Sequence, residues 1–548
     1  MLKFNRILIG CLLVLPMWAM AQSAPPLTVV VVIDQLPLYL LDNNYDLFGD
    51  GGFKKLERDG VLYTECRYSH AVTETGPGHA TISTGCKPVH HGIVANGWVD
   101  STGKDIYCVG CPSVKLLTST GIVDTVAAGC PDNLERDGLS DAWRATFGPD
   151  AKIFSMSVKD RAAITMGGRS ANFSLWINWT NGHFQSSDFY GDRLPAWCAT
   201  YNRNASAYFD KTWQLMRDPQ TYARADGDTL WYEGGEKIGF GNSFPKSLRG
   251  NAADPDKKYI RNLLTSPLGN DYLYGLATTC LDSEQLGRDS IPDLLWVSFS
   301  CNDMCGHTFG PQSQEILDMM LRTDSLIADL LTRLETTLGR DNFWLALTAD
   351  HGVCPACESS LVPRGMGGRF DFAAMEAALN DTLARKFTEG VVPEGGFFSS
   401  FGMTTISLHR RNLRDAGLDL GTVATATVDW LARQSGVAQA VVTMKAEDVA
   451  VIADDKLRAA IQNSYYPDRF GDLYLHPQPF WQTNEVAATH GSIHEYDVHV
   501  PLYLYGQPFG KSRNTAASDP MDLATSLGAA AGVRWESPRD GRARWNAP

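Results

Sequence analysis

Three strongly apolar runs, each followed closely by an aspartate, constrain the fold of this chain more than any other feature. The pairs are residues 28–33 with Asp34, residues 294–299 with Asp303, and residues 343–347 with Asp350. Short runs rich in Val, Leu, Phe and Trp are typical of buried β-strands. In an open α/β sheet, ligand-binding groups gather beyond the carboxyl ends of the strands. We therefore expect the three carboxylates to lie together.

A long amphipathic segment joins the second of these runs to the third. Apolar residues recur at helical spacing between Ser313 and Leu338, and Gly339 supplies a helix stop. A unit of strand, helix and strand makes a parallel sheet. The sequence therefore predicts an α/β protein with a mostly parallel sheet sandwiched by helices.

The length of 548 residues and the hydrophobic content of 44% allow one large core. We expect a single domain over residues 22–548, with inserted cap regions at about 163–290 and 354–487. The first of these stretches has many Trp and Tyr residues, Asn-Gly and Asp-Gly turns, and few long periodic runs. Its composition therefore differs from that of the predicted sheet and helices.

Residues 1–21 have the features of a secretory signal peptide. Lys3 and Arg6 precede an apolar stretch over residues 7–18, and Ala19-Met20-Ala21 forms a cleavage site. A lipoprotein signal ending at Cys11 is the alternative, but it leaves about four apolar residues where an h-region has ~7 to 15. No later segment approaches the ~20 apolar residues of a membrane helix. We expect a periplasmic or secreted protein without a transmembrane anchor.

The formal net charge is −14. An acidic chain is a poor general ligand for nucleic acid, so we expect no nucleic acid binding. It also repels anionic substrates at long range. Any phosphate site must therefore rely on metal ions and a few local Lys or Arg side chains.

The chain has twelve cysteines, one of them in the predicted signal peptide. Export makes disulfides the expected state, although their pairing cannot be derived from the sequence. The alternative is a structural zinc site built from two Cys-x-x-Cys pairs, Cys108 with Cys111 and Cys354 with Cys357.

Six Asp and His residues in four separate segments are the candidate metal ligands. They are Asp34, Asp303, His307, Asp350, His351 and His490. Such a set suffices for two divalent ions, and without a thiolate it suits zinc or another borderline metal better than calcium. A single Asp after a strand is often only a helix cap. Three of them, joined by histidines at suitable spacing, favour one bimetallic site.

Thr75 is the candidate nucleophile. The Gly76-Pro77-Gly78 turn predicts a helix from about Pro77, because Pro is favoured in the first helical turn. Thr75 would then lie just outside a helix N-terminus, where negative charge is stabilised. An alcohol is almost fully protonated at neutral pH, and a coordinated metal can stabilise its alkoxide. A simple turn or cap role is the alternative.

Seven separated motifs lie in an order similar to that of one enzyme superfamily. They are Asp34, residues 75–79, residues 92–96, residues 159–161, Asp303 with His307, residues 350–352 and residues 489–491. This set resembles the alkaline phosphatase superfamily, and within it the PafA-type bacterial alkaline phosphatases. The resemblance spans about residues 27–535 and implies an alkaline-phosphatase-like fold.

The resemblance implies a role for each matching residue. Thr75 would form a covalent phosphothreonine. One Zn²⁺ would be bound by Asp303, His307 and His490, and the other by Asp34, Asp350 and His351 with Thr75. The phosphoryl oxygens would be held by Asn96, Lys159 and Arg161. Cys301 and Cys305 flank Asp303 and have no role in this scheme.

These roles predict an exported, metal-dependent alkaline phosphatase that acts as a monomer on small-molecule phosphate monoesters. A phosphodiesterase or nucleotide pyrophosphatase of the same superfamily is the rival, since it would share the metals, Thr75 and Asn96. Lys159 and Arg161 favour the monoesterase, because added positive charge suits a monoester dianion. A non-catalytic exported metal- or glycan-binding protein is the third possibility. We expect His79 to be a structural or surface residue.

Overall fold

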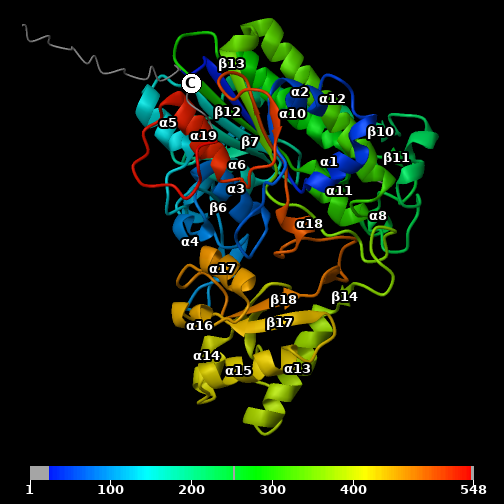
Figure 1. Ribbon diagram of the computed structural model, residues 1–548, viewed down its shortest axis with the longest axis vertical. Helices are drawn as coiled ribbons and strands as arrows, with labels where there is room; N and C mark the ends of the chain where they lie inside the picture. Colours follow the sequence, from blue (N-terminus) through cyan, green and yellow to red (C-terminus); the bar gives the residue numbers. More distant parts are fainter. Residues whose placement is uncertain (1–23, 251–252, 545–548) are drawn as a thin grey trace, which may run out of the picture.

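The computed structural model describes residues 24–250 and 253–544. The predicted signal peptide lies outside these residues. An 11-stranded sheet forms the core of the upper part of the molecule in Figure 1, and a smaller lobe lies below it. Within the described ranges, we find no helix that is both long and apolar enough to cross a membrane.

The strands of the central sheet come from distant parts of the chain. In spatial order they are β21 (Ser512–Asn514), β2 (Val61–Tyr63), β20 (Leu502–Tyr505), β13 (Phe343–Thr348), β1 (Leu27–Ile33), β12 (Asp293–Phe299), β7 (Ile153–Ser157), β8 (Phe173–Ile177), β9 (Phe184–Ser187), β5 (Gly110–Thr118) and β6 (Gly121–Gly129).

The three predicted strands β1, β12 and β13 lie side by side in the middle of this sheet. β1 pairs in parallel with both of the others, and every residue of the three strands is buried. Fully buried, largely apolar strands are expected where helices cover both faces. Ile33 lies opposite Phe299, and Val32 lies opposite Thr348, so the strands end together. The segments that follow them meet at one edge of the sheet, as predicted.

The α/β class is confirmed, but the sheet is mixed rather than mostly parallel. Five of its ten strand pairs are parallel, and four of these are consecutive from β13 to β8. The other five are antiparallel. Two of these five, β5 with β6 and β8 with β9, are hairpins, because short turns connect only antiparallel strands. The long crossover helix indicates the parallel centre but carries no information about these hairpins.

Helices form a layer on each side of the sheet (Figure 1). One layer contains α3 (Thr75–Thr84), α5 (Leu139–Phe147), α6 (Asp160–Gly167) and α19 (Asp522–Ala531). The other contains α2 (Phe53–Asp59), α10 (Pro267–Ser283), α11 (Cys301–Phe309) and α12 (Gln314–Leu338). β12 contacts both α6 and α10 and therefore lies between the two layers.

The ends of two helices test the sequence reasoning. α12 is the predicted long helix, with the Ser313 hydroxyl accepting from the Ile316 N–H at its start and Gly339 at φ 90° after its end. α3 begins at Thr75 rather than near Pro77, so Thr75 lies inside the first turn and not just outside it. Pro77 is then the third helical residue. Its missing N–H has no partner within a helix, so the proline does not delay the start.

The lower lobe is built mainly from residues of the second expected insertion. A four-stranded sheet of β15 (Phe398–Phe401), β16 (Thr405–Leu408), β18 (Leu473–Pro477) and β17 (Val437–Val442) packs with α13 (Phe372–Phe387) and α15 (Leu420–Leu431) around its own apolar core. α17 (Asp455–Ser464) contacts α4 (Pro88–His91) of the main body. In the first expected insertion, by contrast, β8 and β9 belong to the central sheet.

One disulfide, between Cys111 and Cys130, ties β5 to the residue that follows β6. The other nine cysteines of the described residues are free. Because Cys111 is oxidised, the zinc site that would combine it with Cys108, Cys354 and Cys357 is wrong. Cys301 and Cys305 are buried in the apolar core.

Candidate active site

The six predicted metal ligands come together at the carboxyl edge of the central strands. Two groups each hold three ligand atoms within 4.8 Å of one another, namely Asp34, Asp350 and His351, and Asp303, His351 and His490. His307 adjoins the second group, with Nε2 3.2 Å from Asp303 Oδ1. His351 belongs to both groups, so they form one continuous cluster.

The three histidines of this cluster are oriented alike. In each, Nδ1 faces a backbone carbonyl oxygen: His307 that of Ala488 at 2.8 Å, His351 that of Gly352 at 2.9 Å, and His490 that of Thr73 at 2.7 Å. A carbonyl only accepts, so in the neutral ring Nδ1 carries the proton and Nε2 keeps its lone pair. Nε2 faces the carboxylates. This tautomer is the one that a metal-binding imidazole needs.

Some of the buried polar atoms of the cluster lack hydrogen-bond partners. Asp34 Oδ1, Asp350 Oδ2 and His351 Nε2 make no hydrogen bond within the described residues. Burial and the negative charges of Asp350 and Asp303 raise the pKa of Asp34 well above its ordinary value, against the opposing effect of Lys159. Such atoms are costly to bury unless a cation compensates them. The donor set therefore fits divalent metal ions.

Lys159 supplies positive charge at the centre of this cluster. Its Nζ is 2.7 Å from Asp34 Oδ2 and 2.6 Å from Asp303 Oδ2, and the residue is only 3% exposed. Burial lowers the pKa of Lys159, but the two carboxylates more than offset it and the pKa is raised. Burial alone would raise the pKa of Asp303, yet Lys159 and the adjacent histidines hold it well below its usual range. Lys159 therefore stays charged beside the ionised Asp303.

Thr75 Oγ lies beside two cationic side chains. Lys159 Nζ is 3.2 Å away and Arg161 Nη2 is 3.4 Å away. Both cations come from the junction of β7 and α6. Thr75 is also the first residue of α3, and it is buried. A helix N-terminus and two cations together favour negative charge on this oxygen.

Asn96 is anchored next to the same helix end. The Gly76 N–H donates to Asn96 Oδ1 at 2.7 Å, and the Asn96 N–H donates to Glu74 Oε2 at 2.8 Å. Asn96 Nδ2 has no partner among the described residues and is available to a ligand. The helix end also packs closely on the cluster, since a Cβ on Gly78 would lie 2.1 Å from the carbonyl oxygen of Asp350. Glycine at that position lets α3 reach the site.

Gln35 is a site residue that the sequence reasoning missed. Its backbone N–H donates to Asp350 Oδ1 at 3.1 Å and its Nε2 to Asp303 Oδ1 at 2.8 Å. It therefore holds one carboxylate of each group. Its φ of 64° is strained for a residue with a side chain, and Asn302 Nδ2 donates to the carbonyl oxygens of Asp34 and Gln35. The position directly after Asp34 is the only signal of this role in the sequence.

His79 supports the cluster from within α3. It is fully buried, so of the two roles expected for it the structural one holds and the surface one does not. Its Nδ1 is 2.9 Å from the carbonyl oxygen of Thr75 and 3.2 Å from Asp350 Oδ2, while its Nε2 is 2.8 Å from Ser298 Oγ. His79 thus links the helix that carries Thr75 to Asp350 and to β12.

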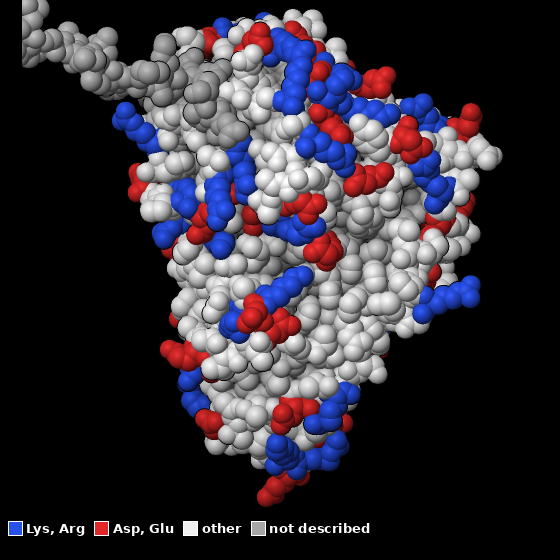
Figure 2. Space-filling model, viewed as in Figure 1, with Lys and Arg blue, Asp and Glu red and all other residues white. Residues whose placement is uncertain are grey.

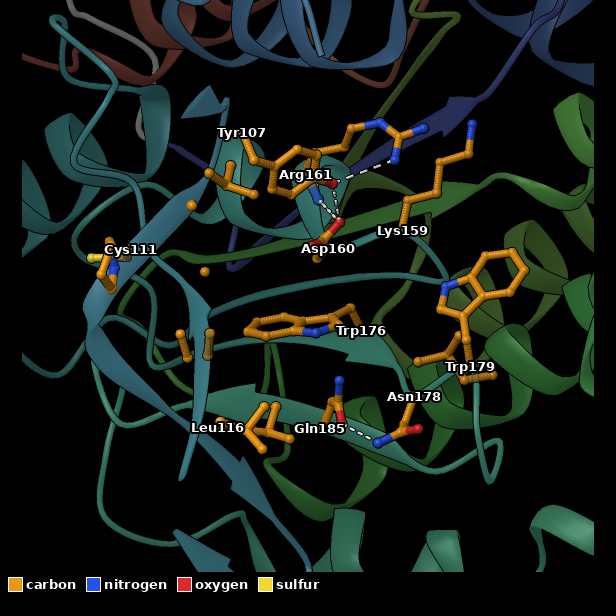
Figure 3. A pocket seen from close by; sticks show the side chains of 18 of the residues that line it. Tyr107, Cys111, Leu116, Lys159, Asp160, Arg161, Trp176, Asn178, Trp179 and Gln185 are labelled. Carbon is orange, nitrogen blue, oxygen red and sulfur yellow. Dashed lines mark hydrogen bonds between the residues drawn. The ribbon is translucent and has the colours of Figure 1, made fainter. Parts of the chain in front are cut away.

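Tyr107 and Asp160 continue the polar network outward from Arg161 (Figure 3). The Tyr107 hydroxyl donates to Asp160 Oδ1 at 2.6 Å and accepts from Arg161 Nη1 at 3.5 Å. These residues line a cavity of about 880 Å³ whose wall also includes Lys159 and Asp303. The site therefore opens into a space much larger than a phosphoryl group.

The positive charge at the site is local. On the face of the described residues shown in Figure 2, Lys and Arg side chains are intermixed with Asp and Glu, and a wide area is uncharged. The whole chain carries a formal net charge of −14. Binding of an anion at Thr75 must therefore depend on short-range contacts with the buried Lys159, with Arg161 and with metal ions.

Comparisons with known proteins show which family the chain is similar to. The family model described as type I phosphodiesterase / nucleotide pyrophosphatase matches residues 28–497. Alkaline phosphatase PhoV of Synechococcus elongatus is 30% identical over 513 residues, which cover 92% of this chain and 90% of that protein. Alkaline phosphatase PafA of Elizabethkingia meningoseptica is 26% identical over 531 residues, covering 95% and 94%.

Solved structures show the same fold. The crystal structure of wild-type alkaline phosphatase PafA superposes with a TM-score of 0.86 at 26% identity, covering 95% of this chain and 98% of that one. Murine ectonucleotide pyrophosphatase / phosphodiesterase 5 shares the fold at 14% identity, with a TM-score of 0.50. The chain belongs to the type I phosphodiesterase / nucleotide pyrophosphatase family of the alkaline phosphatase superfamily. It is a phosphoesterase of the structural type seen in PafA.

Proposed function

We propose that the protein is an exported alkaline phosphatase that hydrolyses phosphate monoesters through a phosphothreonine at Thr75. The observation that carries the proposal is the convergence of Lys159 and Arg161 at 3.2 Å and 3.4 Å from Thr75 Oγ. A monoester dianion bears one more negative charge than a diester monoanion, so two added cations stabilise its reaction more. The similarity to proteins named alkaline phosphatase supports the same choice.

The proposal includes two Zn²⁺ ions. One would be held by Asp303, His307 and His490, and the other by Asp34, Asp350 and His351 with Thr75. Bound there, the ions would supply Lewis-acid charge at the reacting oxygens. The buried, unpartnered oxygens of Asp34 and Asp350 and the aligned imidazoles support this assignment.

The chain's own residues have defined tasks in the reaction. Thr75 Oγ attacks phosphorus, and the bond from phosphorus to the leaving oxygen breaks, releasing the alcohol after it gains a proton. Asn96 Nδ2, Lys159 and Arg161 hold the phosphoryl oxygens, with Arg161 able to engage two of them. Water then attacks the phosphothreonine, which frees phosphate and restores Thr75. Two inversions leave the configuration at phosphorus unchanged.

A phosphodiesterase or nucleotide pyrophosphatase is the second candidate. The description of the matching family model favours it, and Thr75, Asn96 and the metal cluster would serve either reaction. The two candidates differ in what Lys159 and Arg161 do. For a monoesterase they bind substrate charge, whereas for a diesterase their positions near Thr75 would be incidental.

The discriminating experiment removes both cations and compares two substrates. In Lys159→Ala/Arg161→Ala, kcat/KM should fall at least tenfold more for a monoester than for a diester with the same leaving group. Lys152→Ala/Arg169→Ala is the matched control, because these residues flank the same strand and helix on the surface side. It should change neither value. Equal losses on both substrates would remove the charge argument.

Export and a monomeric state are further parts of the proposal. Export is supported by the sequence of residues 1–21, and mass spectrometry of protein expressed from the full-length gene should find an N-terminus near Gln22. An intact N-terminus at Met1 would contradict it. Sedimentation of the zinc-loaded protein should give the mass of one chain.

A further inference from the structure

A groove between the main body and the lower lobe has no role in the proposed reaction. We call it the interlobe groove. One wall is the hairpin of β3 (Gly97–Val99) and β4 (Asp105–Tyr107), and the other comes from β15 and β16 of the lower lobe. Its volume of about 340 Å³ lies at the lower end of the ~300–1,000 Å³ of clefts that hold small organic molecules. The groove is therefore large enough for a small ligand.

The lower-lobe wall of the groove is rich in hydroxyl groups. Ser400 and Ser407 are direct partners across β15 and β16. Thr405 lies two residues before Ser407, so all three side chains leave the same face of the sheet. Ile406 points to the opposite face, into the apolar core of the lobe. Ser399, at the register shift of β15, adds a fourth hydroxyl to the groove.

These four hydroxyls are not used by the protein itself. Within the described residues, none of them makes a hydrogen bond. Elsewhere in the lobe, by contrast, the hydroxyls of Thr427 and Thr443 donate to backbone carbonyl oxygens. A hydroxyl can donate one hydrogen bond and accept two. The wall therefore presents several donors and acceptors side by side to a ligand.

Trp98 supplies an aromatic surface on the other wall. It is half-buried, and its cross-strand partner Ile106 also lines the groove. Trp98 packs against an apolar cluster that includes Tyr474. Tyr474 of β18 is in turn the cross-strand partner of Thr405. The indole therefore lies beside the face of the sheet that carries the hydroxyls.

The charges of the groove do not suit an anion. Asp105 and Arg469 are the charged residues among those that line it. Arg469 is already engaged by the Glu135 carboxylate and by the carbonyl oxygens of Gly92 and Asn133. No free cation remains for a phosphate, and the hydroxyl wall does not suit a lipid chain. A neutral ring with hydroxyls at its edge and C–H groups on its face matches both walls.

We propose that the interlobe groove binds a pyranose unit of a neutral carbohydrate. The C–H face of the sugar lies against Trp98, and its hydroxyls exchange hydrogen bonds with Ser400, Thr405 and Ser407. No bond of the sugar is made or broken. The site goes beyond the proposed phosphatase function, because it does not involve Thr75 or the metal cluster.

Titration calorimetry of the zinc-loaded protein tests for the sugar. The probes are maltose, cellobiose, lactose and N,N′-diacetylchitobiose. At least one should bind with a Kd of roughly 1 mM or tighter, and binding of none would overturn the proposal. Saturating inorganic phosphate should leave that Kd unchanged. Competition by phosphate would place the sugar at the phosphoryl site and would also overturn it.

The length of the ligand distinguishes its two possible sources. A free sugar or a chain end should bind equally well as a disaccharide and as the matching tetrasaccharide. A polysaccharide chain should bind more tightly as the tetrasaccharide. Either result supports a sugar in the groove, whereas weaker binding of both than of glycerol would overturn it.

Two variants locate the sugar. Trp98→Leu and Thr405→Val should each weaken binding by about fivefold. Trp231→Leu and Thr425→Val are the matched controls, because both residues are exposed and neither lines the groove. They should leave the Kd unchanged. An unchanged Kd in both test variants would overturn the proposal.

Hydrogen exchange of the wild-type protein gives the location even if a variant fails to fold. Saturating disaccharide should slow the exchange of residues 97–107 and 398–408, which form the two walls, and leave that of α13 unchanged. Slowing confined to other segments would place the sugar elsewhere and overturn the proposal. Turnover of p-nitrophenyl phosphate without any sugar binding would reject this site and leave the phosphatase proposal intact.

Discussion

Replacing Lys159 by Met should destabilise the metal-free protein far more than the zinc-loaded protein. Met keeps most of the length of the side chain and removes the ammonium group, whose nitrogen lies 2.7 Å from Asp34 Oδ2 and 2.6 Å from Asp303 Oδ2. Breaking a buried ion pair by removing one partner costs about 3–5 kcal/mol, because the remaining charge is left uncompensated. Here two carboxylates lose the same partner.

This free energy converts to a measurable shift in Tm. The unfolding entropy of about 2.1 cal/mol/K per residue amounts to about 1.1 kcal/mol/K for a chain of this size. A loss of about 3–5 kcal/mol therefore lowers Tm by about 3–5 °C in the presence of a chelator. In the zinc-loaded protein the ions would neutralise Asp34 and Asp303, so the same substitution should lower Tm by about 1 °C or less.

Differential scanning calorimetry in chelator and in zinc measures both shifts. Lys152→Met is the control, because Lys152 pairs with Asp289 near the surface at 3.0 Å and contributes only about 0–1 kcal/mol. Its effect should be the same in both conditions. An equal Tm loss for Lys159→Met with and without zinc would refute the reasoning, since it would show that metal ions do not share the partners of Lys159.

Substitutions at Thr75, Tyr107 and Glu315 test the site and the core. Thr75→Ser should retain turnover of p-nitrophenyl phosphate and Thr75→Ala should lose most of it; wild-type kcat/KM in Thr75→Ala would exclude the covalent route. Tyr107→Phe should lower monoester kcat/KM by about three- to tenfold, since a hydrogen bond to a charged group contributes roughly 1.5–3 kcal/mol at most and the contact with Arg161 is long at 3.5 Å. Tyr274→Phe is the control, because it removes a hydroxyl bonded to an aspartate away from the site, and it should leave the kinetics unchanged. Equal losses of kcat/KM in the two variants would contradict a role of Tyr107 in positioning Arg161. Burial raises the pKa of Glu315 from 4.5 to about 7. Protonation of Glu315 therefore stabilises the folded state by about 3 kcal/mol below about pH 4.5, and this contribution is lost as the pH rises through 7. The free energy of unfolding of Glu315→Gln, measured with urea, should not show that loss, and parallel pH profiles of variant and wild type would contradict this assignment.

The central strands and the metal cluster could be predicted because their signals are local. Each buried strand is a short apolar run, and each aspartate follows one, so the convergence of Asp34, Asp303 and Asp350 depends only on parallel pairing. The long helix α12 was equally predictable from its period and from Ser313 and Gly339 at its ends. The resemblance to a family added the roles that residue types alone left open.

Features that depend on contacts across the fold could not be derived in this way. The left-handed φ of Gln35 and its bonds to two carboxylates arise from the packing of three segments, and no local pattern encodes them. The start of α3 was misplaced by two residues because proline is compatible with several positions in a first turn. The cavity of about 880 Å³ beside Arg161 depends on two hairpins whose side chains meet only after the sheet has formed.

The ratio of kcat/KM for p-nitrophenyl phosphate to that for methyl p-nitrophenyl phosphate tests the central claim most directly. The two esters share a leaving group and differ by one charge, which is the property that Lys159 and Arg161 are proposed to recognise. Purified protein lacking residues 1–21 and loaded with zinc should strongly prefer the monoester, lose activity on chelation and regain it with zinc. Preference for the diester would contradict the account, place the protein among the phosphodiesterases and leave the two cations with a structural role.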